Sequence, residues 1–396
     1  METINDFKGL LVYMKSYKYY GNNDIINITD NAPDVSDYVI LDVTSSKPSA
    51  SEVLSVAKAI YQRKSEARFW IGTPKYDMNT QPVYNFIKGS IEEIKNVFMA
   101  DTTGRTIWNN CVKGVYLNME RIYDKITYSA SVDQNNTKSF LIAKNLSNYV
   151  HNTLDLNLLW IPYYGYGSDP ETVIKDLAYM VARTNIFDIV IIQPRYYFDD
   201  DFTPDNVLVK NLDAVKYSVN CNNICYRDGN EVFTRTCYNA KVGFEMEVDN
   251  SVVRPIKQDN ETDIDFQKRL DAQKEKRAKY EKYVSTFKTF RNNDSVPKCF
   301  YAGNINDIKN KYILIEDIYG IPYGDANNDG RITANDAAIV LQYALNGLIP
   351  DELVRVCDVD GNGTITANDA ACIQQKSLDA SYDFPIIERV FNPEES

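Results

Sequence analysis

The 396-residue sequence contains a single histidine, His151, and no run of eighteen or more apolar residues. With one histidine, the chain cannot build a His-Glu-x-x-His zinc site or any multi-histidine metal centre. A Ser-His-Asp triad would have to use His151 itself. Because a membrane helix needs about 20 consecutive apolar residues, the sequence also predicts no membrane span.

Basic residues are scarce relative to acidic ones. The chain has 43 lysines and arginines against 55 aspartates and glutamates, which gives a net charge of −12. Nucleic acid is therefore not expected as the main partner, since phosphate binding needs clustered Lys and Arg. The excess is uneven: from Gly324 onward there are 13 acidic and 4 basic residues. A shift of this size predicts a domain boundary.

The seven cysteines are an odd number, so at least one thiol is free. Three of them cluster as Cys221, Cys225 and Cys237. No histidine lies near enough to complete a zinc site, although a metal remains an alternative. We interpret the cluster as a local disulfide or as buried thiols.

Two twelve-residue segments near the C-terminus repeat one pattern, Asp325–Asp336 and Asp358–Asp369. Oxygen-bearing side chains fall at positions 1, 3, 5 and 12, and glycine falls at position 6. Calcium takes six to eight oxygens, and a loop of this length encloses it when alternate side chains point inward and position 7 offers its carbonyl. The sequence therefore predicts two Ca²⁺ sites, with the ligands Asp325, Asn327, Asp329, Arg331, Asp336, Asp358, Asp360, Asn362, Thr364 and Asp369.

Each loop is predicted to lead into a helix with an apolar face, no helix is predicted before either loop, and position 12 is Asp instead of Glu. In order, spacing and length, the segment from Tyr323 to about Pro385 resembles a type I dockerin. The resemblance implies that a cohesin domain of a scaffoldin binds loop positions 10 and 11 and the helix that follows, in either of two orientations. The residues concerned are Ala334, Asn335, Gln342, Ala367, Asn368 and Gln375.

The dockerin resemblance also implies export and attachment to a cellulosome-type scaffold with polysaccharide-degrading partners. Met1 is followed by acidic and polar residues, and the first apolar run, Gly9 to Met14, is too short for a signal peptide. We therefore expect a secreted or cell-surface protein whose leader is absent from this sequence.

The first 300 residues alternate short β-branched runs with amphipathic helical stretches. Eight strands with intervening helices predict a (β/α)8 TIM-like barrel, with an open doubly wound sheet as the alternative. We expect the barrel at 1–304, a final helix and linker at 305–322, an all-α dockerin at 323–388 and a tail at 389–396. The predicted strands are Lys8–Met14, Asp37–Thr44, Ala67–Thr73, Val112–Met119, Asn157–Tyr164, Phe187–Gln193, Lys241–Val248 and Pro297–Ala302.

The seventh predicted strand carries Glu245, Glu247 and Asp249, which alternation puts on one face. Acids inside a barrel are costly unless water, partners or a substrate reach them. Glu120 follows the fourth strand, and acids after strands 4 and 7 face each other across a barrel mouth, as in retaining glycosidases. We predict Glu120 as the acid/base and Glu247 as the nucleophile or base, with Glu245 as a deeper alternative.

Polar and aromatic residues at the other strand ends would suit a carbohydrate ligand, because aromatic rings offer flat apolar faces with polar edges. Arg195 would pair with an acid of the seventh strand and lower its pKa. The predicted substrate-binding residues are Asn118, Trp160, Tyr163, Tyr164, Gln193, Arg195, Tyr196, Asp249 and Tyr301. The alternative is a structural ion network without catalysis.

Three motifs of the barrel region follow one another in order: Trp160–Gly165, Gln193–Phe198 and Gly243–Asp249. Together they resemble an uncharacterised bacterial domain-of-unknown-function family of about this size. The resemblance covers the predicted strands 4 to 8 and is weak over residues 1–110. It supports the barrel and its acids, and it implies no particular activity.

Three functions compete at this point. The first is a glycoside hydrolase that acts on a polysaccharide through two carboxylates. The second is a non-catalytic carbohydrate-binding or adhesion barrel displayed by the dockerin. The third is a peptidase that pairs Cys299 or Cys111 with His151, but the predicted helix that holds His151 ends away from the strand mouths.

Overall fold

The structure is a computed structural model, and it describes the following residues: 4–14, 29–30, 32, 34–42, 47–77, 83–124, 126, 137–165, 169–182, 184–198, 206–228, 231–236, 240–301 and 319–392. The chain divides into two compact units. The first contains residues 1–249 and 285–309, and the second contains residues 250–284 and 310–396.

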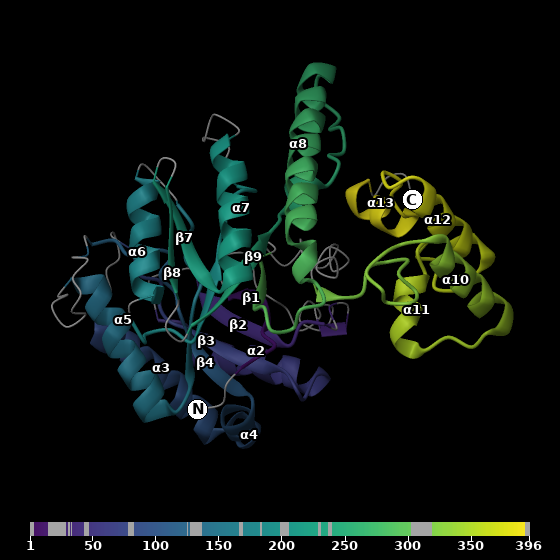
Figure 1. The fold of residues 1–396 in the computed structure, drawn as a ribbon. Helices are drawn as coiled ribbons and strands as arrows, with labels where there is room; N and C mark the ends of the chain where they lie inside the picture. The colour runs from purple at the N-terminus through teal and green to yellow at the C-terminus, as the bar shows by residue number, and fades with distance from the viewer. Residues whose placement is uncertain are drawn as a thin grey trace. The chain divides into compact units, whose positions relative to one another are not determined.

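Eight parallel strands of the first unit close into a barrel in the order β1-β10-β9-β6-β5-β4-β3-β2 (Figure 1). The predicted barrel is therefore confirmed, and the open sheet is wrong. All eight strands begin within two residues of the predicted start. Their bounds are β1 Lys8–Met14, β2 Asp37–Asp42, β3 Arg68–Gly72, β4 Val112–Leu117, β5 Asn157–Trp160, β6 Ile189–Ile192, β9 Lys241–Glu247 and β10 Lys298–Tyr301.

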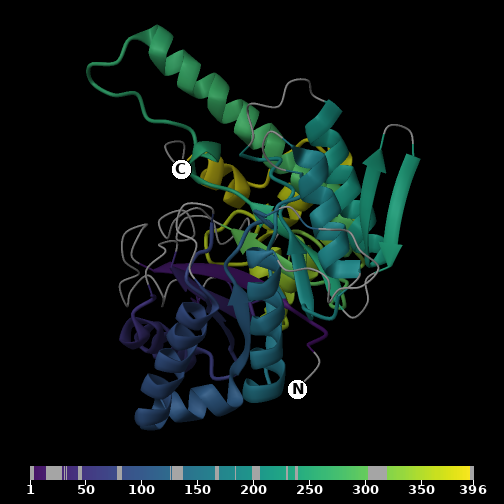
Figure 2. The ribbon, with the colours of Figure 1, turned by 90° about the vertical axis from the view of Figure 1, so that its left-hand side faces the viewer.

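The helices of the first unit lie outside its barrel strands (Figure 2). They are α2 Ala50–Arg63, α3 Tyr84–Ala100, α4 Thr102–Asn110, α5 Lys138–Tyr149, α6 Pro170–Ala182 and α7 Asn206–Cys221, with a π-helical turn at Val150–Leu154 and a 3-10 turn at Lys288–Phe290. The short helix α4 was not predicted. The predicted final helix and linker at 305–322 fall mostly outside the described residues, which resume at 319.

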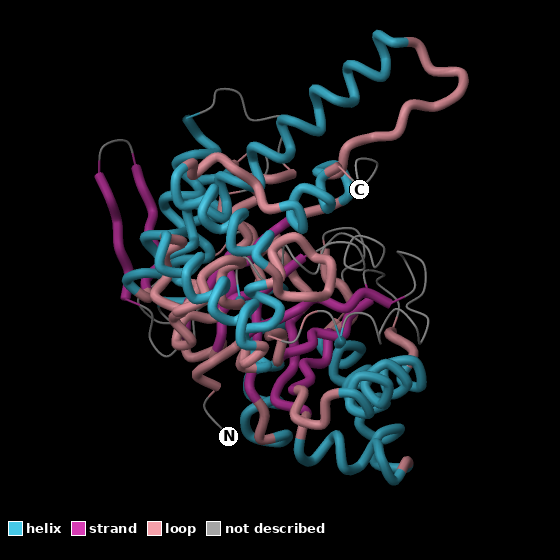
Figure 3. The backbone as a smooth tube through the Cα atoms, turned by 90° about the vertical axis from the view of Figure 1, so that its right-hand side faces the viewer, coloured by secondary structure: helices cyan, strands magenta, loops and turns pink. Residues whose placement is uncertain are grey.

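The cysteine-bearing insert after α7 contains a β-hairpin that the sequence analysis missed. Strands β7 (Asn223–Asp228) and β8 (Glu231–Thr236) pair antiparallel and pack against α6 and α7. In Figures 2 and 3 the hairpin stands apart from the barrel strands. Cys221 is a free, exposed thiol, and Cys237 lies outside the described residues.

The barrel interior is filled by apolar side chains that alternate along the strands. Among the buried side chains of this core are Phe7, Trp70, Leu159 and Ile191. The opposite face of β9 turns outward, where the ring of Phe244 stacks on Phe287 at a centroid distance of 4.2 Å. This alternation makes one face of β9 pack on the helical layer and turns the glutamates of the other face inward.

Close packing at β9 yields a test of the barrel. A Cβ at Gly243 would lie 2.0 Å from the carbonyl oxygen of Pro297, so Gly243→Ala must shift the backbone. We expect a loss of about 1–3 kcal/mol in the free energy of unfolding, measured by urea denaturation. Gly89→Ala is the control, because its Cβ would meet only the Lys47 Nζ at 3.9 Å, and alanine favours the helix. Equal effects of the two changes would contradict the packing.

The second unit is helical. It contains the long helix α8 (Asp263–Phe287, whose last residues belong to the first unit), α10 (Ala334–Asn346), α11 (Asp351–Cys357), α12 (Ala367–Leu378), α13 (Pro385–Phe391) and a 3-10 turn at Asn250–Val252. None of the helices in the described ranges has the length and apolarity to cross a membrane.

Two contacts close this unit at its C-terminal end. Arg277 of α8 pairs with Asp383 and Glu388, and its guanidinium lies 4.3 Å from the ring centroid of Phe391. The ring of Phe384 is so near Gly324 that a Cβ there would come within 2.7 Å of it. The start and the end of the calcium-loop segment therefore lie together.

Candidate functional site

A cavity of about 360 Å³ opens at the carboxyl ends of the barrel strands, where ligand sites of such barrels lie. Its size falls in the range of small-molecule sites. The residues that line it come from all eight barrel strands or from the segments directly after them. They are Leu11, Tyr13, Leu41, Lys75, Tyr116, Asn118, Glu120, Tyr163, Gln193, Arg195, Phe198, Glu245, Glu247 and Tyr301.

All three predicted catalytic acids line this cavity. Glu245 and Glu247 are 2% and 1% exposed, and Glu120 is more open. The Oε2 of Glu120 lies 3.2 Å from the Nζ of Lys75. Tyr163 also hydrogen-bonds to Glu120, and burial followed by the charge of Glu120 raises the Tyr163 pKa far above its usual range.

The acids of β9 lie close enough to repel each other. Burial raises the pKa of Glu245 well above its ordinary value of 4.5, and the charges of Glu247 and Glu120 raise it further. Arg195 acts in the opposite direction, as predicted from the sequence, but does not outweigh burial. The cavity therefore combines an acid that favours its neutral form with a carboxylate, Glu120, that has a lysine beside it.

Three polar residues of the rim are held by the backbone or by a ring. The Asn118 amide donates to the carbonyl of Asp42 at 3.0 Å, and the Gln193 amide donates to the carbonyl of Ile161 at 2.7 Å. Arg195 has a left-handed backbone conformation, with φ of 60°, and its guanidinium lies 4.9 Å from the centre of the Tyr163 ring. Strained backbone of this kind is concentrated at functional sites.

Aromatic rings form one wall of the cavity. Tyr301 packs edge-to-face against Tyr13 at 5.5 Å and against Phe198 at 5.6 Å. Burial raises the pKa of Tyr13 well above its usual range, so the phenol stays neutral. Such a wall offers apolar faces with hydroxyl groups at the edge, which suits a sugar ring.

Four predicted substrate-binding residues do not line the cavity. Trp160 is 1% exposed and stacks on Phe187 at 4.7 Å, which places it in the core. Tyr164 is also buried, and the carboxylate of Asp249 accepts a hydrogen bond from the Tyr197 hydroxyl at 2.9 Å. The fourth, Tyr196, is half-buried.

The sequence analysis missed several lining residues, of which Lys75 matters most. It lies in the segment after β3, three positions beyond Gly72, and supplies the cation beside Glu120. The sequence signal that could have identified Lys75 is its position just after a predicted barrel strand. Tyr116 was missed as a mid-strand residue, and Phe198 was quoted only as part of a motif.

His151 lies at the other end of the barrel. Its Nε2 is 2.8 Å from the Oδ2 of Asp188, which directly precedes β6 and so marks the amino end of the strands. Cys299 points into the barrel, and Cys111 contacts the carbonyl of Ser65. The geometry brings neither thiol to the histidine, so it gives no support to a peptidase.

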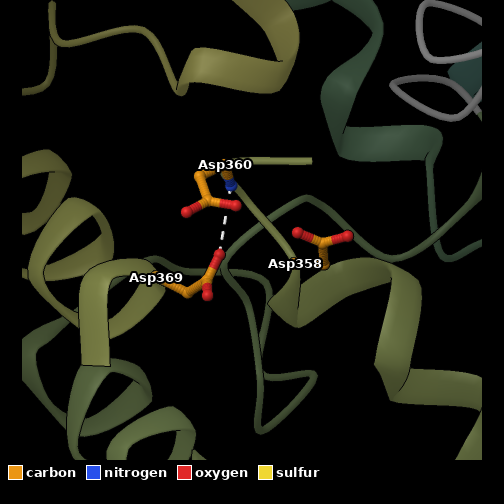
Figure 4. Close-up of side chains that lie close together, drawn as sticks. All are labelled: Asp358, Asp360 and Asp369. Atoms are coloured by element: carbon orange, nitrogen blue, oxygen red, sulfur yellow. Dashed lines mark hydrogen bonds between the residues drawn. The ribbon is translucent and has the colours of Figure 1, made fainter. Parts of the chain in front are cut away.

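The two predicted calcium loops have the same local structure. Gly330 and Gly363 have φ of 82° and 86°, the left-handed conformation that the turn at position 6 requires. In the second loop, carboxylate oxygens of Asp358, Asp360 and Asp369 lie within 4.8 Å of one another (Figure 4). This all-oxygen donor set fits a hard cation such as Ca²⁺.

The acids at position 12 also start the helices. Asp336 accepts hydrogen bonds from the backbone and hydroxyl of Thr333, which caps α10, and Asp369 does the same with Thr366 at α12. One oxygen of Asp369 accepts from the backbone N–H of Asp360 at 3.1 Å (Figure 4). Burial raises the pKa of Asp325 and of Asp358 at position 1. Loop closure and helix formation are therefore coupled.

All six predicted partner-binding residues have exposed side chains. They lie at the starts and on the outer faces of α10 and α12, in matching positions of the two repeats. The repeats differ in one contact: the Asn368 amide donates to Asp360 at 2.7 Å. The residues are Ala334, Asn335, Gln342, Ala367, Asn368 and Gln375.

Several solved structures are similar in overall fold at very low identity. The spore cortex-lytic enzyme SleL of Bacillus megaterium QM B1551 is 10% identical, with a TM-score of 0.41, over 80% of this chain and 75% of its own. A family GH18 chitinase of Cycas revoluta, solved with allosamidin, is 10% identical, with a TM-score of 0.43, over 78% and 98%. The family 5 glycoside hydrolase PbGH5A of Prevotella bryantii B14 is 11% identical, with a TM-score of 0.38, over 80% and 95%. No curated protein matches the chain.

The C-terminal segment has a specific match. Residues 323–376 match the family of the dockerin type I domain, over both calcium loops and the helices α10 and α12. Dockerin domains bind calcium, in agreement with the carboxylate cluster of the second loop. Residues 323–376 are therefore a type I dockerin domain, in a chain whose first unit is a closed eight-stranded parallel barrel.

Proposed function

We propose that this protein is an extracellular cellulosome-type component, attached to a scaffoldin when its dockerin binds a cohesin domain. The match of residues 323–376 to the dockerin type I family carries this part of the proposal. The exposed, paired positions at the starts of α10 and α12 are consistent with two binding orientations.

For the barrel we propose glycoside hydrolysis of a polysaccharide. The observation that carries this proposal is the set of three glutamates in one cavity at the barrel mouth, on β9 and after β4. Burying acidic side chains is unfavourable unless they have a functional role. Glycosidases use two carboxyl groups that flank the bond they cleave. The aromatic wall of Tyr13, Phe198 and Tyr301 would hold the sugar ring.

In the proposed mechanism, Glu120 gives a proton to the glycosidic oxygen and Glu247 attacks the anomeric carbon or activates a water. The Nζ of Lys75 lies 3.2 Å from the Oε2 of Glu120, so the acid/base of the proposed mechanism has a cation beside it. The oxygens of Asn118 and Gln193 accept from sugar hydroxyls, since their amide nitrogens are engaged by the backbone.

One observation favours a second candidate, a barrel that binds carbohydrate without cleaving it. The Nζ of Lys75 lies 3.2 Å from the Oε2 of Glu120, so a cation occupies the position beside the group that should give the proton. A binding protein needs no proton donor, and the same aromatic wall would serve it equally well.

Product release separates the two functions. The full chain is incubated with calcium and with cellulose, xylan, mannan or pectin, and new reducing ends are measured alongside pull-down by the insoluble polymer. We expect new reducing ends on at least one polymer. Saturable binding with no reducing ends on any of them would favour the binding barrel.

A further inference from the structure

Glu245 is an enclosed acid of the cavity, and one of its two carboxyl oxygens has no hydrogen-bond partner among the described residues. Its side chain is 2% exposed, and among the described residues no donor lies within hydrogen-bond distance of its Oε1. It nevertheless lines the cavity, as does Glu247 two positions further along β9. If the side chain were ionised, its Oε1 would be buried with negative charge and no hydrogen bond from the protein, which is unfavourable.

The groups around Glu245 supply too little positive charge to stabilise an ionised carboxylate there. Burial raises its pKa well above 4.5, the like charges of Glu247 and Glu120 raise it further, and Arg195 opposes them. Three neutral groups complete its surroundings, and burial raises the pKa of each. They are the phenols of Tyr13 and Tyr116 and the thiol of Cys299, from β1, β4 and β10.

We propose that Glu245 is held as a neutral carboxylic acid on the floor of the cavity, where its O–H group donates a hydrogen bond to a hydroxyl of an uncharged sugar. The charge balance of the lining supports the choice of sugar. Apart from Glu245, the lining has two acidic residues, Glu120 and Glu247, and two basic ones, Lys75 and Arg195. Such a lining gives no net attraction to a uronic acid.

This inference rests on the proposed function for its ligand, and it deepens that function in one respect. A neutral Glu245 is not a nucleophile, so the reaction falls to Glu120 and Glu247. Glu245 becomes a substrate-positioning donor instead of the alternative nucleophile predicted from the sequence.

Protonation of Glu245 is testable without any activity. Between pH 4.5 and its raised folded-state pKa, the folded protein binds more protons than the unfolded chain, so stability falls as pH rises. Glu245→Gln removes this dependence. Thermal unfolding of the full chain in saturating calcium is followed from pH 4 to 8. The barrel Tm of the variant should exceed that of the wild type by a margin that grows by about 2–4 °C per pH unit.

Glu93→Gln is the matched control, because Glu93 is an exposed acid on α3. The difference in Tm between this variant and the wild type should not change with pH. A flat margin for Glu245→Gln as well would overturn the proposal. Should that variant fail to fold, the wild type suffices: carbon-13 NMR of labelled glutamates at pH 7 should show one carboxyl carbon in the neutral form. Finding every glutamate ionised would equally overturn it.

The hydrogen bond to sugar has its own readout. Calorimetry compares cellohexaose, xylohexaose and mannohexaose with hexagalacturonic acid. We expect the wild type to prefer a neutral sugar, Glu245→Met to weaken binding roughly tenfold or more, and Glu245→Gln, which keeps a donor, to restore most of it. Preference for the acidic sugar would overturn the inference. No binding of any sugar, with a growing Tm margin, would reject the proposed function and the sugar contact while leaving the neutral acid supported.

Discussion

Removal of calcium by a chelator should unfold the dockerin while the barrel stays folded. The ligands of each loop are spread over twelve residues, and the position 12 acids also cap α10 and α12. Without the cation, the buried carboxylates of Asp325 and Asp336 repel each other. We expect two bound Ca²⁺, each adding about 4 kcal/mol when free calcium is 1,000 times the dissociation constant.

Calorimetric scans with and without chelator measure this effect, and calcium titration counts the ions. The dockerin transition should disappear or fall by tens of degrees, and binding to a cohesin should be lost with it. Asp358→Asn should abolish one site, because it removes a ligand charge and keeps a hydrogen-bond acceptor. Asp351→Asn, an exposed acid outside the loops, is the control. A dockerin transition that ignores the chelator would contradict the assignment.

The barrel was predictable because its strands carry their signal locally. Continuous apolar runs such as the one that became β6, Ile189–Ile192, are typical of strands buried on both faces. The hairpin β7–β8 was missed although the sequence has a Gly-Asn pair, Gly229–Asn230, between the two segments that became strands, and such a pair is a turn signal. Helix α4 is short and follows α3 after a single residue, Asp101, so periodicity alone did not separate the two.

Two rules, strand alternation and strand order, allowed part of the site to be predicted from the sequence. These two rules brought Glu120, Glu245 and Glu247 to one cavity. They do not give loop conformation, and so the Lys75 contact to Glu120 was missed. They also treat every residue after a strand as available to a ligand. Trp160 shows the error, since residues at its parity on β5 face the helices and not the cavity.

Glu120→Gln and Glu247→Gln should each lower polysaccharide hydrolysis by about 10²–10⁴-fold if the barrel is a glycosidase. Glutamine keeps the shape of each side chain but neither transfers a proton nor attacks a carbon. Initial rates of reducing-end release measure the loss, and Glu93→Gln, an exposed acid on α3, is the matched control. Circular dichroism establishes that each variant is folded. Rates near wild type in both glutamine variants would reject the hydrolase.

The leaving group then separates the roles of the two acids. An aryl glycoside with a good leaving group departs without protonation, so Glu120→Gln should lose far less activity on it than on the polysaccharide. Glu247→Gln should lose as much on both, because the attack on the anomeric carbon is still required. The opposite pattern would exchange the roles, with Glu120 as the nucleophile. The Nζ of Lys75, 3.2 Å from the Oε2 of Glu120, is compatible with that exchange.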